Sequence, residues 1–170
     1  MGLVVQPFWS PGLKQPAAKG AMIGFGDVHK KAHVYRAVIE GLGYALLDGL
    51  HKIEKAGKIT VEEVAVSGGA SQSDEICQIT ADIFNLPLAR GHTYETSGLG
   101  AAIVTCVGLG IHPSFASAVK KMVKYDKVFE PDPAHVEIYR ELYSRVYQKM
   151  YKSLHPLYEE IREVTGYPEK

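Results

Sequence analysis

The sequence has little cysteine and no excess of either charge. Only two cysteines, Cys77 and Cys106, occur among the 170 residues, and they form no CxxC pattern. These features argue against a disulfide scaffold and a zinc knuckle, and a chain of this length can bury enough surface to fold without either. Lys and Arg together number 19, as do Asp and Glu. Balanced charge argues against a protein that coats nucleic acid or an anionic membrane, so we expect neither as a partner.

Long apolar runs and targeting patterns are also missing. No run approaches the roughly 18–20 apolar residues that a membrane-spanning helix needs. The opening segment MGLVVQPFWSPG has no basic stretch ahead of its short apolar run, and Pro7 interrupts that run. It therefore does not resemble a secretory signal, and we expect a cytoplasmic location.

Familiar metal and phosphate motifs do not occur. The seven histidines contain no HExxH pair, and His29 and His33, four residues apart, have no third ligand nearby in the sequence. We therefore expect no metal site in this chain. The sequence contains neither a GxGxxG fingerprint nor a GxxxxGK[ST] loop, which argues against both common phosphate-binding loops.

The sequence alternates short β-branched runs with helical patterns, which is typical of an α/β protein. A long helix over 31–55 carries apolar residues around most of its circumference, so we expect it to be largely buried. Small residues over 96–107 predict a helix that packs very closely against a neighbour. We expect strands at 3–5, 21–25 and 61–67, an extended segment at 86–88, and helices at 31–55, 73–84, 96–107, 114–122 and 135–154, the last bent or broken by Pro156 and resumed to residue 163.

The last helix carries a row of tyrosines spaced four residues apart, Tyr139, Tyr143, Tyr147 and Tyr151, which share one stripe of the helix. A half-buried packing face is our main interpretation of this stripe, and a face for docking a partner is the alternative.

The most informative segment is VEEVAVSGGASQSDEICQITADIF, a predicted strand, turn and helix. Two glycines after a strand allow another molecule to approach the backbone, and the next helix begins with free N–H groups. A tight turn that binds nothing is the alternative. Asp74 and Glu75 lie in the first helical turn, where their charges suit the helix dipole and would repel a phosphate. A nucleotide bound here would therefore meet the turn with its uncharged adenosine end.

Several segments resemble the signature motifs of one family and follow the same order. They are GLVVQPFWSPGLKQP at the start, GAMIG with HV and AVIE after it, VSGGA, ADI followed by LP, and ETSGLGAA. Together they resemble the FGGY carbohydrate kinases, which include glycerol kinase, xylulokinase, ribulokinase and gluconokinase. The chain departs from the family pattern at Phe25, Ser67, Asn85 and Gly98, and at Gly12-Leu13-Lys14, where the family has GER.

The resemblance implies a fold and a domain organisation. The expected fold is an α/β, actin-like ATPase lobe, also called ribonuclease H-like, with a mixed sheet flanked by helices. Residues 1–170 would form the C-terminal, nucleotide-binding domain, and the N-terminal sugar-binding domain would be absent. The chain would then be a fragment of an ATP-dependent kinase that phosphorylates a sugar or polyol hydroxyl, and we expect it to be inactive alone.

The resemblance also implies roles for individual residues. Gly68 and Gly69 would let adenine and ribose lie against the backbone, Ala70 would support the base, and Ser73 would reach the purine edge. ATP and Mg²⁺ would be the cofactors of the complete enzyme, and the missing lobe would bind most of the sugar. No Asp or Glu matches the motif of the catalytic base, so we assign no catalytic residue, and we interpret Asp82 as structural.

Two alternatives from functional classes other than enzymes remain open. The chain could be a stand-alone binding or regulatory module that keeps the actin-like half-fold without catalysis, or an interaction protein that uses the tyrosine stripe. The sequence identifies neither the sugar nor the oligomeric state. Without the partner lobe, the face that would line the cleft should be apolar, and a homo-oligomer formed through this face is one possible state.

Overall fold

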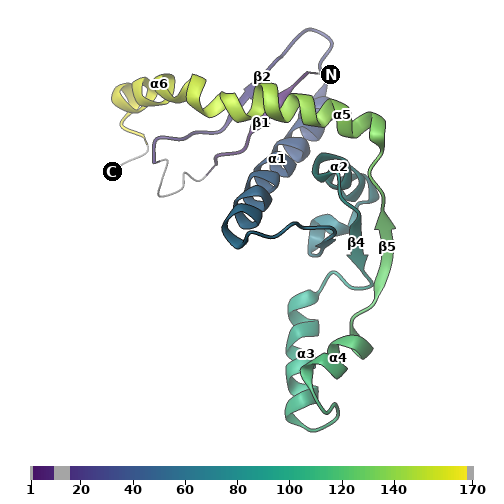
Figure 1. The fold of residues 1–170 in the computed structure, drawn as a ribbon. Coiled ribbons are helices and arrows are strands. Elements are labelled where there is room, and N and C mark those ends of the chain that lie inside the picture. Colours follow the sequence, from purple (N-terminus) through teal and green to yellow (C-terminus); the bar gives the residue numbers. More distant parts are fainter. Residues whose placement is uncertain (1, 10–15, 168–170) are drawn as a thin grey trace. The chain divides into compact units, whose positions relative to one another are not determined.

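A computed structural model of the chain describes residues 2–9 and 16–167 (Figure 1). The predicted departure at Gly12-Leu13-Lys14 lies outside these residues. The contacts divide the chain into two compact units, each described by itself. Unit 1 combines the chain up to Ile59 with the chain from Pro133 onward, and unit 2 comprises Thr60–Asp132. No helix among the described residues combines the length and apolarity needed to cross a membrane.

Unit 1 contains a two-stranded antiparallel sheet and the longest helix. Strands β1 (Val4–Gln6) and β2 (Ala21–Ile23) pair with Val5 opposite Met22. Helix α1 (Lys31–Gly57) packs one face on this hairpin, so that Leu3, Val5 and Ala37 form a small core. The opposite face of α1 is more exposed than the sequence predicts, because its apolar residues encircle the helix while the hairpin covers only one side. Leu42 is 44% exposed and Leu46 is 61% exposed.

Helix α1 and strand β1 approach each other most closely at Gly41. A Cβ atom added there would lie 2.4 Å from the carbonyl oxygen of Val5, a distance that real side chains do not reach. Glycine at this position therefore lets the helix contact the strand directly.

The C-terminal helix of unit 1 is continuous. It begins as α5 (Pro133–Leu142), passes through a π-helical turn at Tyr143–Tyr147, and continues as α6 (Gln148–Thr165). Of the two predicted outcomes at Pro156, a bend or a break, the break is wrong, since Pro156 lies inside α6. A proline removes one backbone donor and disfavours a helix, but Met150 and Tyr158 on either side are buried and anchor the segment.

The tyrosine stripe forms a packing face, as the main interpretation predicts. Tyr139, Tyr143 and Tyr147 are buried, and all three have ring contacts with Tyr44 of α1. The closest pair, Tyr44 and Tyr147, has ring centroids 5.1 Å apart. The four rings therefore join the C-terminal helix to α1 within unit 1.

Unit 2 is built on a mixed three-stranded sheet in the order β3-β4-β5. Strand β3 (Val64–Val66) runs parallel to β4 (Leu88–Gly91), and β5 (Tyr125–Phe129) runs antiparallel to β4. Between β3 and β4 the chain forms a short 3₁₀ helix, η1 (Gly69–Gln72), and then α2 (Asp74–Phe84). Cys77 and Ala81 of α2 pack on Leu88 and Phe129 of the sheet. The predicted α/β class is confirmed, whereas β5 is absent from the sequence prediction.

Helices α3 (Thr96–Gly108) and α4 (Phe115–Met122) complete unit 2 and lie side by side (Figure 1). The predicted close packing of α3 is wrong for the described residues. Gly98, Gly100, Ala101 and Ala102 are all exposed, and Ile103 is the buried residue of the helix. Of the two cysteines, Cys106 is only partly buried, whereas Cys77 is fully buried. Small residues permit close packing, but in unit 2 α4 covers only part of α3.

Candidate functional site

The predicted nucleotide-binding residues lie together where β3 leads into α2. Gly68 has a φ angle of 84°, a left-handed conformation that glycine adopts without strain. The Gly68 N–H donates to the carbonyl of Tyr94 at 3.2 Å, and the Gly68 carbonyl accepts from the backbone N–H of Ser71 at 3.1 Å. The turn is therefore held on both sides of Gly68.

The turn presents open backbone at both glycines. A Cβ atom added to Gly68 or to Gly69 would meet no heavy atom within 4 Å. Gly69 and Ala70 are exposed, and Gly68 and Ser73 are partly buried. No protein atom therefore occupies the space beside the two glycines, and an open backbone of this kind is compatible with a flat group lying against the chain.

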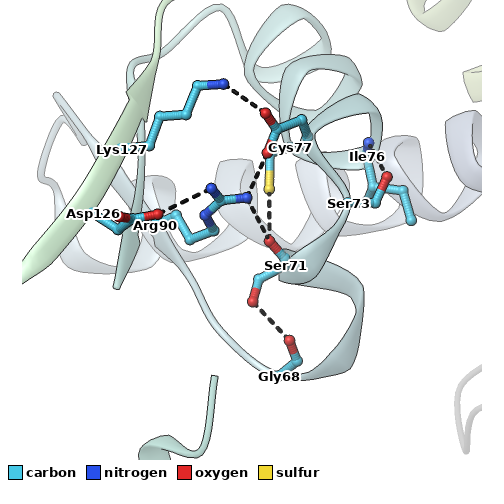
Figure 2. Close-up of polar contacts among 9 residues, drawn as sticks. Gly68, Ser71, Ser73, Ile76, Cys77, Arg90, Asp126 and Lys127 are labelled. Atoms are coloured by element: carbon cyan, nitrogen blue, oxygen red, sulfur yellow. Dashed lines mark hydrogen bonds and ion pairs between the residues drawn. The ribbon is translucent and has the colours of Figure 1, made fainter. Parts of the chain in front are cut away.

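The Ser73 hydroxyl has a structural role at the start of α2. Its Oγ accepts a hydrogen bond from the backbone N–H of Ile76 at 3.3 Å and so caps the start of α2 (Figure 2). A serine hydroxyl accepts through its oxygen and donates through its own proton. The cap uses the hydroxyl oxygen as an acceptor, and the Ser73 hydroxyl proton takes no part in it.

One of the two acidic side chains in the first turn of α2 is paired with cations. Asp74 is paired with two cations, Lys127 and Arg90, each at 2.6 Å. Hydrogen bonds from Lys127 and then from Arg90 lower the pKa of Asp74 below its usual value. Because this carboxylate is already neutralised, Glu75 remains as the acidic group of the first turn that could repel a phosphate.

The two cations beside the turn, Arg90 and Lys127, could not be predicted from the sequence. Arg90 of β4 contacts the carbonyl of Ser71, the carboxylate of Asp74 and the carboxylate of Asp126 (Figure 2). The only available signal is an arginine in a short, otherwise small and apolar strand. Its partners on β5 cannot be found while that strand is missing from the prediction.

Cys77 lies under the same turn but has no reactive character. Its Sγ donates to the carbonyl of Ser71 at 3.4 Å, and burial raises the pKa of its thiol. A buried thiol with a raised pKa carries little thiolate at neutral pH, so Cys77 acts as part of the core.

Two hollows flank the turn. One has a volume of about 170 Å³ and is mostly apolar, with Ser67, Thr96 and Leu99 in its lining. The Thr96 hydroxyl donates to the Ser67 hydroxyl at 3.3 Å. The other is an open groove of about 550 Å³ along α2 and β5, lined by Asp74, Glu75 and Lys127 among others.

Acidic side chains do not assemble into a metal site among the described residues, where no group of three His, Cys, Asp or Glu side chains is suitably placed. Asp82 is 2% exposed and accepts hydrogen bonds from Gln78 Nε2 at 2.8 Å and from the Asp132 N–H at 2.9 Å. The contact with Asp132 ties α2 to the segment that follows β5, which agrees with the predicted structural role of Asp82.

The chain is similar to known carbohydrate kinases over more than half of its length. Residues 5–109, more than half of the chain, match the model of the C-terminal domain of the FGGY family of carbohydrate kinases. A protein of Escherichia coli (strain K12) named "Uncharacterized sugar kinase YgcE" is 35% identical over 138 residues, which cover 81% of this chain and 28% of that protein. A xylulose kinase of Staphylococcus epidermidis is 36% identical over 123 residues, 72% of this chain and 25% of that enzyme.

A solved structure gives the same result for the fold. The xylulose kinase of Rhodospirillum rubrum superimposes with a TM-score of 0.78 at 29% identity, over 93% of this chain and 32% of that enzyme. The chain therefore spans between a quarter and a third of the length of these relatives.

Proposed function

Since the chain belongs to the FGGY family of carbohydrate kinases and matches its C-terminal domain, we propose that it is the nucleotide-binding lobe of an ATP-dependent kinase. The complete enzyme would phosphorylate a hydroxyl group of a sugar or polyol. We place sugar binding and the catalytic carboxylate in an N-terminal lobe outside this chain, and the reaction in the cytoplasm. The assignment of residues 1–170 to one C-terminal domain is part of this proposal.

The observation that supports the proposal most strongly is the open turn after β3. Gly68 adopts a glycine-specific conformation, and Gly69 has free space where a side chain would be. In the proposed complex the backbone of Gly68 and Gly69 lies against adenine and ribose, Ala70 supports the base, and the Ser73 hydroxyl donates to the purine edge. The two glycines thus provide contact area without the steric hindrance of a Cβ.

The chemistry of phosphoryl transfer depends on groups outside this site. ATP supplies the phosphoryl group, and Mg²⁺ neutralises its charge in enzymes of this kind. The described residues offer no acidic cluster for the metal. This chain's contribution is therefore to hold and orient the adenosine end, and we expect the isolated chain to phosphorylate no sugar.

Substitution of Gly69 by alanine tests the proposal. The added methyl meets no protein atom and φ at Gly69 is not positive, so the unfolding midpoint should stay unchanged. The methyl would, however, occupy the space of the base. We expect the unmodified chain to bind ADP with a Kd of about 1 mM and Gly69→Ala to weaken binding at least about five-fold.

A matched control uses Gly49 of α1, which also has no heavy atom within 4 Å of an added Cβ. Gly49→Ala should leave the ADP affinity unchanged, as measured by NMR titration. Equal ADP affinity of Gly69→Ala and the unmodified chain, with both folded, would mean that the double glycine only shapes a turn.

A further inference from the structure

Arg90 connects the sheet of unit 2 to the turn that carries the proposed nucleotide site. Its Nη1 donates to Asp74 Oδ1 at 2.6 Å and to the Ser71 carbonyl at 3.4 Å, and its Nη2 donates to Asp126 Oδ2 at 3.0 Å. Only 18% of the side chain is exposed, and the guanidinium lies 5.5 Å from the ring centroid of Phe129. One side chain thus joins β4, β5, η1 and α2.

Ser71 in turn is hydrogen-bonded to Gly68. Ser71 is 1% exposed, and its hydroxyl donates to the Gly68 carbonyl at 2.7 Å. The backbone N–H of Ser71 donates to the same carbonyl. A continuous set of contacts therefore runs from Arg90 through the Ser71 carbonyl and hydroxyl to the residue whose φ angle is 84°.

We propose that Arg90 is the positioning residue of the adenosine-binding turn, holding η1 and the start of α2 in the conformation that receives the base. This inference rests on the proposed function. Arginine suits the role because its planar guanidinium presents several donors in a fixed geometry, so one side chain serves three acceptors at once. A turn that is already ordered before binding loses less entropy when the ligand arrives, which raises the affinity.

Lys127 provides an internal control for charge. Its Nζ contacts Asp74 Oδ2 at 2.6 Å, the same distance as the Arg90 contact to that carboxylate. The contacts of Lys127 are with Asp74 and the Phe129 ring rather than with η1. A loss of Lys127 therefore removes an ion pair from Asp74 but leaves the link between Arg90 and Ser71.

The test compares Arg90→Met, Arg90→Lys and Lys127→Met in the 170-residue chain. In ligand-free protein, we expect Arg90→Met to shift the amide resonances from Gly68 to Ser73, and Lys127→Met to leave those of Gly68 and Ser71 in place. Arg90→Met should weaken ADP binding at least about five-fold, and Lys127→Met less than about two-fold. Arg90→Lys keeps the charge but cannot contact Asp74, Asp126 and Ser71 together, so it should resemble Arg90→Met.

Three results would overturn the inference: equal effects of Arg90→Met and Lys127→Met, unchanged turn amides in Arg90→Met, or wild-type behaviour of Arg90→Lys. If Arg90→Met does not fold, Arg90→Lys decides the question, because it keeps the positive charge. Failure of the proposed function has a different signature, namely that ADP shifts no turn amide in the unmodified chain. The ligand-free comparison would then still show whether Arg90 sets the turn.

Discussion

Three glycines meet three different demands in this chain. Gly68 needs a positive φ angle, Gly69 keeps space open above the turn, and Gly41 lets α1 touch β1. The sequence identifies the first two because they follow a β-branched run and interrupt it. Gly41 stands inside a helical pattern, and its importance arises from a contact with a distant strand that no local pattern records.

Gly41→Ala should destabilise unit 1 by about 1–3 kcal/mol, because the new methyl would overlap the Val5 carbonyl and force the helix and strand apart. Gly49→Ala in the same helix meets open space and should stabilise the chain by up to about 1 kcal/mol through helix propensity. Denaturant unfolding of both variants checks this pair. Equal stability of the two variants would show that α1 does not contact β1 as closely as described.

The role of Arg90, like that of Gly41, could not be predicted from the local sequence. A lone arginine in a short strand predicts nothing, since its value depends on Asp126 from β5 and on the Ser71 carbonyl from η1. The candidate turn itself could be predicted, whereas the side chain that holds it could not.

At the scale of elements, the helices lie close to their predicted ranges, while two strands are less well predicted. Side-chain burial does not alternate along strand β5. Only Phe129 is buried, and the other four residues are exposed, namely Tyr125, Asp126, Lys127 and Val128. A half-buried strand normally shows a regular period of two, and this one does not. Strand β4 extends to Gly91 because it pairs on both sides, with β3 and with β5.

The tyrosine face that joins α1 to the C-terminal helix should make unit 1 sensitive to alkaline pH. Burial raises the pKa of Tyr139 and of Tyr143 from 10.0 to about 12, and it also raises those of Tyr44 and Tyr147. Among the described residues, Tyr44 and Tyr147 have buried hydroxyls without a hydrogen-bond partner. Such phenols strongly favour the neutral form.

A phenol with a raised pKa contributes its full stabilisation below the unfolded value near 10 and loses it as the pH rises to about 12. We therefore expect the chain to lose stability between pH 10 and about 12, with part of its phenolate absorbance appearing only near the upper limit. Spectroscopic titration of the folded chain and of the chain in denaturant measures this. Identical titration curves in both conditions would contradict the packing described for the tyrosines.

At the scale of the whole molecule, the motifs of the FGGY family predict the fold more securely than periodicity does. The likeness to a solved xylulose kinase confirms the actin-like lobe, in agreement with the mixed sheet of unit 2. The periodicity of the chain predicts only its α/β class. The exposed small residues of α3 follow the family motif, yet the described chain does not supply the close neighbour that such residues predict.

The most direct test of the account is a residue-resolved NMR titration of the labelled 170-residue chain with ADP and with adenosine. We predict shifts centred on the amides from Gly68 to Ser73, an affinity of about 1 mM, and nearly equal binding of adenosine, since the turn contacts the uncharged end of the nucleotide. Shifts confined to another part of the chain, or no shift at several times that concentration, would contradict the proposed site.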